Sequence, residues 1–177
     1  PQAAASQYSC RQNFTILTTD GYWNNNSNYV AVDEQDNTPG PTVTGPGNQS
    51  FTYSAVAPYA SADSNTLADV AMRYWKNDLR TDLVNQVPTT SSNPAFWQHM
   101  VNFTIAFGVN GTLANPGDLP ALAAGTKNWP NPSGGGAATI DDLWHAALNS
   151  RGRALSARDT VEYSSAIKAI LDEMSAW

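Results

Sequence analysis

The sequence has 177 residues, of which 41% are hydrophobic and only 14% are charged, and its formal net charge is −6. This length and apolar content predict one folded domain over residues 1–177. The Lys and Arg residues form no cluster, which argues against nucleic acid as a partner. No apolar run approaches the roughly 18 residues of a membrane helix, so no membrane span is expected.

A weakly charged surface rich in Asn, Ser and Thr favours an exported or cell-surface protein. The first ten residues lack the basic and apolar regions of a signal peptide, so an export signal is expected to be removed or to lie upstream. Cys10 is the single cysteine, and no disulfide can therefore form within the chain. Two interpretations of Cys10 stay open: a free thiol, or a cysteine whose partner lies outside this sequence.

The first element is a strand at residues 13–19 (NFTILTT), which is apolar and β-branched enough to be covered on both faces. Asp20 and Gly21 follow it. Ligands of open α/β sheets bind at the carboxyl ends of strands, where a carboxylate suits Mg²⁺ or Ca²⁺. The competing interpretation is a turn aspartate, and spacing alone favours it because one carboxylate does not make a metal site.

Residues 24–62 read as a long loop rich in Gly and Pro, with a small hairpin formed by the PTVT and SFTYS segments. The loop carries an acidic spot, Asp33 to Asp36 (DEQD). Its alternation weakly resembles a calcium loop but lacks the glycine and the distal glutamate of an EF-hand. We therefore expect a solvated acidic loop at this position.

A helix is predicted over residues 64–80, capped by Asp63 or Ser64. Its apolar residues recur with helical spacing and form one stripe: Leu67, Val70, Ala71, Tyr74 and Trp75. A second strand is predicted at residues 100–109, where Gly108 lets the chain turn. Residues 110–138 then form a second long loop, with a helical turn near DLPALAAG.

The last third of the chain predicts a helix over residues 140–150, a short strand at RALSA (153–157) and a helix over residues 160–174. Thr139 and Asp142 match a capping box for the first of these helices, and Gly152 suits its C-terminal cap. Asp159 and Glu162 form another capping-box pattern. The resulting alternation of strands and helices predicts an α/β fold with a parallel sheet, resembling half of a doubly wound domain.

Three further polar residues are weighed as catalytic or metal-binding candidates. Asp141 and His145 lie four residues apart on one helix, a spacing compatible with metal binding or acid–base work. We favour a structural role, in which Asp141 and Asp142 complement the helix dipole and His145 bonds locally. His99 is interpreted in the same way. No hydrolase, phosphate-loop or dinucleotide motif occurs, so the sequence does not predict an enzyme.

Several stretches together resemble PilY-type proteins of the type IV pilus system. They are NFTILTTDGYWN, SNTLADVAMRYWKNDLR, PAFWQHMVNFTIAFGVNGTL, WPNP and IDDLWHAALNSRGRALSA. The resemblance covers nearly the whole chain and implies an exported, pilus-associated protein of assembly, adhesion and surface sensing. It also implies that residues 1–177 form the C-terminal part of a von Willebrand factor A-like domain, with residues 24–62 and 110–138 as loop insertions.

Such domains often carry a metal-ion-dependent adhesion site, and the TTDG of residues 18–21 matches its last element. The resemblance therefore implies Asp20 as a ligand of Mg²⁺ or Ca²⁺ in the complete domain. The D-x-S-x-S loop of such sites does not occur here and would belong upstream of residue 1. We therefore expect no tight metal binding by this chain alone.

Missing strands would leave an open sheet edge, which is a template for pairing with another chain. We expect the long loops, a second copy, or minor pilins or other pilus proteins to cover it; a host or surface ligand is a further expected partner. Two functions follow from the resemblance. The first is an extracellular adhesion and assembly module without enzymatic activity. The alternative is a structural subunit for protein–protein contacts that binds no metal.

Overall fold

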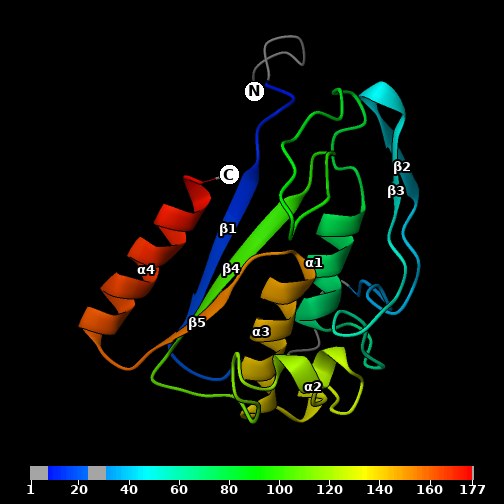
Figure 1. The fold of residues 1–177 in the computed structure, drawn as a ribbon. Helices are drawn as coiled ribbons and strands as arrows, with labels where there is room; N and C mark the ends of the chain where they lie inside the picture. Colours follow the sequence, from blue (N-terminus) through cyan, green and yellow to red (C-terminus); the bar gives the residue numbers. More distant parts are fainter. Residues whose placement is uncertain (1–7, 24–30, 177) are drawn as a thin grey trace.

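The computed structural model describes residues 8–23 and 31–176. The first part of the predicted 24–62 loop, residues 24–30, lies outside the described residues. Three parallel strands form the central sheet in the order β1-β4-β5: β1 (Asn13–Thr19), β4 (Met100–Phe107) and β5 (Ala154–Ala157). Figure 1 shows β1 at one edge of this sheet. The predicted α/β fold with a parallel sheet is confirmed.

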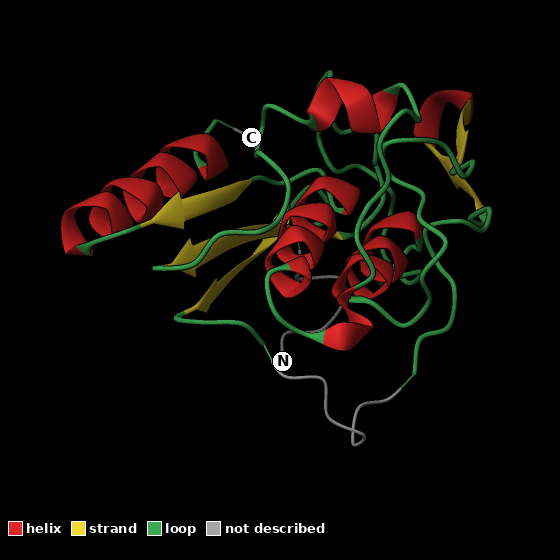
Figure 2. Cartoon of the chain, turned by 90° about the horizontal axis from the view of Figure 1, so that it is seen from below, coloured by secondary structure: helices red, strands yellow, loops and turns green. Residues whose placement is uncertain are grey.

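Helices cover both faces of the sheet (Figure 2). On one face, alternate residues of β4 pack against α4 (Thr160–Met174) in a cluster that includes Val101, Phe103, Ile105 and Ile170. On the other face, Ala106 packs against α3 (Ala138–Asn149), and α1 (Leu67–Lys76) packs beside α3. This alternation explains why β4 is apolar along nearly its whole length.

A second core lies away from the sheet, beneath the hairpin of β2 (Thr42–Gly45) and β3 (Gln49–Thr52). The hairpin predicted from PTVT and SFTYS is confirmed, with its turn at the 3₁₀ segment Pro46–Asn48. The buried members of this core are mainly large and aromatic: Val43, Tyr53, Met72, Trp75, Ala95, Phe96 and Trp97. Residues 110–138 contain α2 (Leu119–Ala123) and a second 3₁₀ segment, Pro132–Gly134.

Helix α1 differs from its prediction at both ends. Its N-cap is Thr66, not Asp63 or Ser64, because Thr66 and Asp69 form a complete capping box. The helix ends at Lys76, after which Asn77 is extended. Its fully buried apolar face is Ala68, Ala71, Met72 and Trp75, whereas Tyr74 of the predicted stripe is 48% exposed.

The predicted caps of α3 are wrong. The helix begins after Ala137 without a side-chain cap. The Asp142 carboxylate instead accepts hydrogen bonds from backbone N–H groups in the first turn of α1. At the C-terminus, Arg151 and not Gly152 adopts the left-handed conformation, with a φ of 67°. By contrast, Asp159 is confirmed as the N-cap of α4, because it accepts hydrogen bonds from the backbone of Val161 and Glu162. The Glu162 carboxylate accepts from the backbone N–H of Arg158, one residue before the position that a capping box requires.

None of the helices in the described part of the chain combines the length and apolarity that crossing a bilayer requires.

Gly152 is required for another reason, its close approach to β4. A Cβ at this position would collide with the backbone carbonyl of Asn102, which a side-chain rotation cannot relieve. We predict that Gly152→Ala lowers the free energy of unfolding by about 2 kcal/mol, the usual cost of overpacking. Urea denaturation measures this loss. Gly134→Ala is the control, since a Cβ at Gly134 meets nothing within 4 Å; equal stability of the two variants would contradict the prediction.

Candidate functional site

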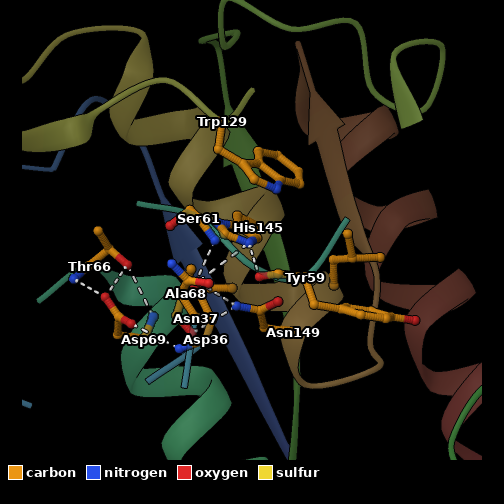
Figure 3. Close-up of polar contacts among 12 residues, drawn as sticks. Asp36, Asn37, Tyr59, Ser61, Thr66, Ala68, Asp69, Trp129, His145 and Asn149 are labelled. Atoms are coloured by element: carbon orange, nitrogen blue, oxygen red, sulfur yellow. Dashed lines mark hydrogen bonds and ion pairs between the residues drawn. The ribbon is translucent and has the colours of Figure 1, made fainter. Parts of the chain in front are cut away.

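Asp69, in the first turn of α1, joins two distant parts of the chain. Its Oδ2 accepts hydrogen bonds from the backbone N–H and hydroxyl of Thr66, at 3.0 and 2.9 Å. Its Oδ1 accepts hydrogen bonds from the backbone N–H groups of Gln35 and Asp36, at 2.7 and 3.2 Å. One fully buried carboxylate thus caps the helix and anchors the loop that precedes the hairpin (Figure 3).

Asp36 was expected in a solvated loop, and that expectation is wrong, since the residue is 0% exposed. Its Oδ1 accepts a 2.7 Å hydrogen bond from the Ser61 N–H, and its Oδ2 accepts one of 3.1 Å from Asn149 of α3. The Tyr53 hydroxyl donates to its backbone carbonyl. Asp36 therefore links the loop to α3, which no pattern within DEQD reveals.

Glu34 completes a group of three carboxyls, Glu34, Asp36 and Asp69. One oxygen atom from each lies within 4.8 Å of the other two. Carboxylate oxygens at this spacing are the ligands that Ca²⁺ and Mg²⁺ prefer. Glu34 accepts hydrogen bonds from the Asn37 N–H and the Ser64 hydroxyl. Each of the six carboxylate oxygens therefore already accepts at least one hydrogen bond.

Lys76, which is only 5% exposed, places a positive charge near this group. Its ammonium donates to the carbonyls of Gln35 and Thr38 and to the Thr38 hydroxyl, at 2.6 to 3.2 Å. Burial lowers the pKa of Lys76, while the nearby carboxylates oppose that shift. A metal ion would have to displace several of these donors, so the arrangement fits a polar core better than a ready cation site.

His145 reaches the same cluster from α3, not through a local bond as expected. Its Nε2 lies 2.7 Å from the Tyr59 carbonyl, so it carries the proton and donates it there, and it lies 3.5 Å from Asp36 Oδ2. Burial lowers the pKa of His145 to about 4 and raises that of Asp36 to about 8. Burial therefore favours the neutral form of both side chains, which weakens any charge attraction between them.

Aromatic rings pack against two residues in this region, His145 and Arg151. Trp129 stacks on His145 with ring centroids 4.2 Å apart and donates its indole N–H to the Pro58 carbonyl. The Arg151 guanidinium lies over two rings, 3.8 Å from the centroid of Tyr59 and 3.7 Å from that of Trp75. Burial lowers the pKa of Arg151 to about 10, so it stays charged at neutral pH. Stacking on these two rings stabilises the cation.

Asp141 and His145 are not brought together. Asp141 accepts hydrogen bonds from the Thr112 N–H and hydroxyl and from the Leu113 N–H, and so fixes the loop after β4. Asp142 accepts from the Leu67 and Ala68 N–H groups, which places a carboxylate at the positive end of α1. Both residues do stabilise backbone N–H groups, but on segments other than their own helix.

Asp20 lies in the bend directly after β1, where its side chain is exposed. The Thr19 hydroxyl donates to the Gly21 carbonyl at 2.7 Å and shapes this bend. Among the described residues, Asp20 belongs to no group of three or more acidic, histidine or cysteine side chains able to share an ion. Its role as a metal ligand stays a prediction.

The two remaining candidates have ordinary surroundings. His99 is buried with its Nδ1 2.7 Å from the Trp97 carbonyl and its Nε2 2.8 Å from Asn93, and burial lowers its pKa to about 4. It is a neutral core histidine. Cys10 is exposed and forms no disulfide within the described chain, so the question of a partner outside this sequence stays open.

Comparison with known proteins points to one group. The type IV pilus biogenesis factor PilY1 of Pseudomonas aeruginosa strain PAK is 37% identical over 193 residues, covering 96% of this chain. PilY1 of strain PAO1 is 34% identical over 195 residues, covering 97% of the chain, and PilY1 of strain UCBPP-PA14 is 34% identical over 95% of it. The resemblance to PilY-type proteins is confirmed.

The chain spans 16% of the length of each of these relatives, so it resembles one part of a much longer protein. No protein-family model matches the chain, and no solved structure gives a significant match.

The buried carboxyls predict an unusual dependence of stability on pH. Burial raises the pKa of Asp36 to about 8 and that of Asp142 to about 7, from an ordinary 3.8. The folded state thus holds protons that the unfolded chain has lost, and stability from these groups falls as pH rises toward 8. The lowered pKa values of His99 and His145 have the opposite effect below pH 6.5, the ordinary histidine pKa. There the unfolded chain binds more protons at these histidines than the folded chain does, so their contribution makes stability rise with pH.

We therefore predict that the free energy of unfolding falls as the pH rises from about 6.5 to about 8, where the histidines no longer offset the carboxyls. Urea denaturation at a series of pH values measures it. Asp36→Asn, which keeps the residue neutral, flattens the fall, while the exposed Asp172→Asn does not. A stability that stays level or rises over this interval in the wild-type chain would contradict the assignment.

Proposed function

We propose that this chain is a non-enzymatic module of a PilY-like protein and takes part in type IV pilus assembly and surface adhesion outside the cell. The observation that carries the proposal is the 34–37% identity to pilus biogenesis factors over 95–97% of the chain. The weakly charged surface, with 14% charged residues, agrees with an extracellular location. Minor pilins or other pilus proteins are the expected partners, with a host or other surface as the ligand.

The arrangement of polar residues supports a role without catalysis. The carboxylates of Asp69, Asp141 and Asp142 each accept hydrogen bonds from backbone N–H groups of distant segments. His145 and His99 donate to backbone carbonyls, and burial keeps both neutral near pH 7. Groups engaged in this way hold the fold together and are not free to exchange protons with a substrate.

For the adhesion site, we propose Asp20 as one ligand of Mg²⁺ or Ca²⁺ in a complete von Willebrand factor A-like domain, of which residues 1–177 are the C-terminal part. The exposed carboxylate at the carboxyl end of β1 is suited to such a role. Among the described residues, Asp20 belongs to no group of acidic, histidine or cysteine side chains that could share a divalent cation. The remaining ligands would come from outside them, so this chain alone is expected to bind no cation tightly.

The alternative function is a structural subunit that makes protein–protein contacts without metal. The open edge of β1 favours it, since an unpaired strand edge is a ready surface for another polypeptide. The two functions share a place in the pilus system and differ in whether Asp20 matters.

The test is made in the source bacterium. Deleting the segment that encodes this chain in frame is expected to reduce surface pili and attachment at least about tenfold; unchanged piliation and attachment would contradict the proposal. Asp20→Ala is expected to reduce attachment and its dependence on Mg²⁺ or Ca²⁺ while leaving pili in place. Asp172→Ala, which changes an exposed aspartate on α4, is the control. An Asp20→Ala strain that attaches normally would favour the structural subunit.

A further inference from the structure

A cavity of about 390 Å³ lies beside the polar cluster, between residues 57–63 and residues 122–129. This volume is within the range of small-molecule sites. The lining combines one aromatic ring with amide, hydroxyl, carboxylate and ammonium groups, which come from Asn37, Ser61, Asp63, Lys127, Asn128 and Trp129. The other lining residues are small or apolar. Such a mixture suits a ligand that carries many hydrogen-bonding groups and also has an apolar face.

Trp129 is the aromatic residue of this lining, and its ring is held in place. The indole stacks on His145 with ring centroids 4.2 Å apart, and it meets Trp144 edge to face at 5.1 Å (Figure 3 shows the stack). Its N–H donates to the Pro58 carbonyl at 2.7 Å. Trp129 is only half-buried, so part of the ring stays open to the cavity. A ligand can therefore pack on this ring without first ordering the side chain.

The two walls of the cavity are fixed to each other and to the core. The Asn131 amide donates to the Asp63 carboxylate and joins the two lining segments. The backbone N–H of Ser61 donates to Asp36 Oδ1 at 2.7 Å, which ties one wall to the polar cluster. The cavity is thus formed in advance, and a ligand that enters it loses little affinity to rearrangement of the protein.

The cavity offers hydrogen-bonding groups that the fold does not use. Among the described residues, the buried hydroxyl of Ser61 has no hydrogen-bond partner. A buried polar group without a partner is unfavourable, and a ligand that supplies one removes that cost. Asn37 and Asn128 are exposed, and each side-chain amide can both donate and accept. Donors and acceptors therefore surround the open part of the indole.

The charges of the lining do not favour an ionic ligand. Asp63 and Lys127 carry opposite charges, so the lining has no net charge. The Lys127 ammonium also lies 2.7 Å from the carboxylate of Asp118, which neutralises it locally. An anion such as phosphate would meet one paired ammonium and one carboxylate. The balance of charge favours a neutral polar ligand.

We infer that this cavity binds a neutral saccharide. A sugar ring has an apolar C–H face, which packs on the electron-rich face of an indole such as that of Trp129. Its hydroxyls donate and accept hydrogen bonds, and they match the amides of Asn37 and Asn128 and the carboxylate of Asp63. The inference rests on the described residues alone and does not depend on the pilus role or on Asp20.

The test is a titration of the 177-residue chain with glucose, galactose, N-acetylglucosamine and maltose, followed by NMR of the tryptophan side chains. We expect at least one of these sugars to bind with a dissociation constant in the millimolar range or tighter. It should shift the indole N–H signal of Trp129 and leave those of the buried Trp75 and Trp97 in place. Absence of binding by all of these sugars would overturn the inference. So would inorganic phosphate that shifts the Trp129 signal when the sugars do not.

A matched pair of variants locates the binding. Asn128→Ala and Asn110→Ala each remove an exposed asparagine amide, and only Asn128 lines the cavity. Both variants should melt close to the wild type because both side chains face solvent. Asn128→Ala should weaken sugar binding about tenfold, the usual effect of losing a ligand hydrogen bond, and Asn110→Ala should leave it unchanged. Equal affinity of the Asn128→Ala chain and the wild type would overturn the inference.

Discussion

The attachment of the loop before the hairpin to helices α1 and α3 depends on one buried carboxylate, that of Asp69. It accepts four hydrogen bonds, two from Thr66 at the start of α1 and two from the backbone of residues 35 and 36. Hydrogen bonds to a charged group contribute about 1.5–3 kcal/mol each, and loss of the acceptor would leave buried N–H groups without a partner. With this anchor in place, Asp36 meets Ser61 and Asn149, and the loop joins α1 to α3.

This use of carboxylates shapes what the region can do. Oxygen atoms of Glu34, Asp36 and Asp69 have the spacing of a cation site. They already accept hydrogen bonds from backbone N–H groups, hydroxyls and a side-chain amide, and the buried ammonium of Lys76 lies close by. The cluster around Asp36 and Asp69 is therefore a polar core whose carboxylate oxygens already have hydrogen-bond partners. Asp20 lies just beyond the end of β1, and an uncharged groove between β1 and α1 lies along that strand.

Periodicity and turn residues were sufficient to predict the strands, the helices and the hairpin, because these depend on residues within a few positions of one another. The predicted caps of α1 and α3 were wrong. The motifs shared with PilY-type proteins also identified the relatives correctly. The roles of polar side chains that bond to distant parts of the chain could not be predicted from the sequence. Asp36 looked like part of a solvated loop because its partners lie 25 and 113 residues away, and Asp142 looked like a cap for its own helix because its true partners lie 75 and 74 residues away. The apolar stripe of α1 was recognised, but its spacing could not show that its residues face two different places. Trp75 packs in the aromatic core, whereas Val70 and Tyr74 line an apolar groove beside β1.

The most direct test of this account is residue-resolved hydrogen exchange in the Asp69→Ala chain. If the carboxylate anchors the loop to both helices, the amides of Gln35, Asp36 and Ser61 lose protection together, while those of β4 and α4 keep theirs. The loss should be about a hundredfold or more, since the bonds removed contribute several kcal/mol. Protection at these three amides that matches the wild-type chain would contradict the account, because the loop would then be held without Asp69.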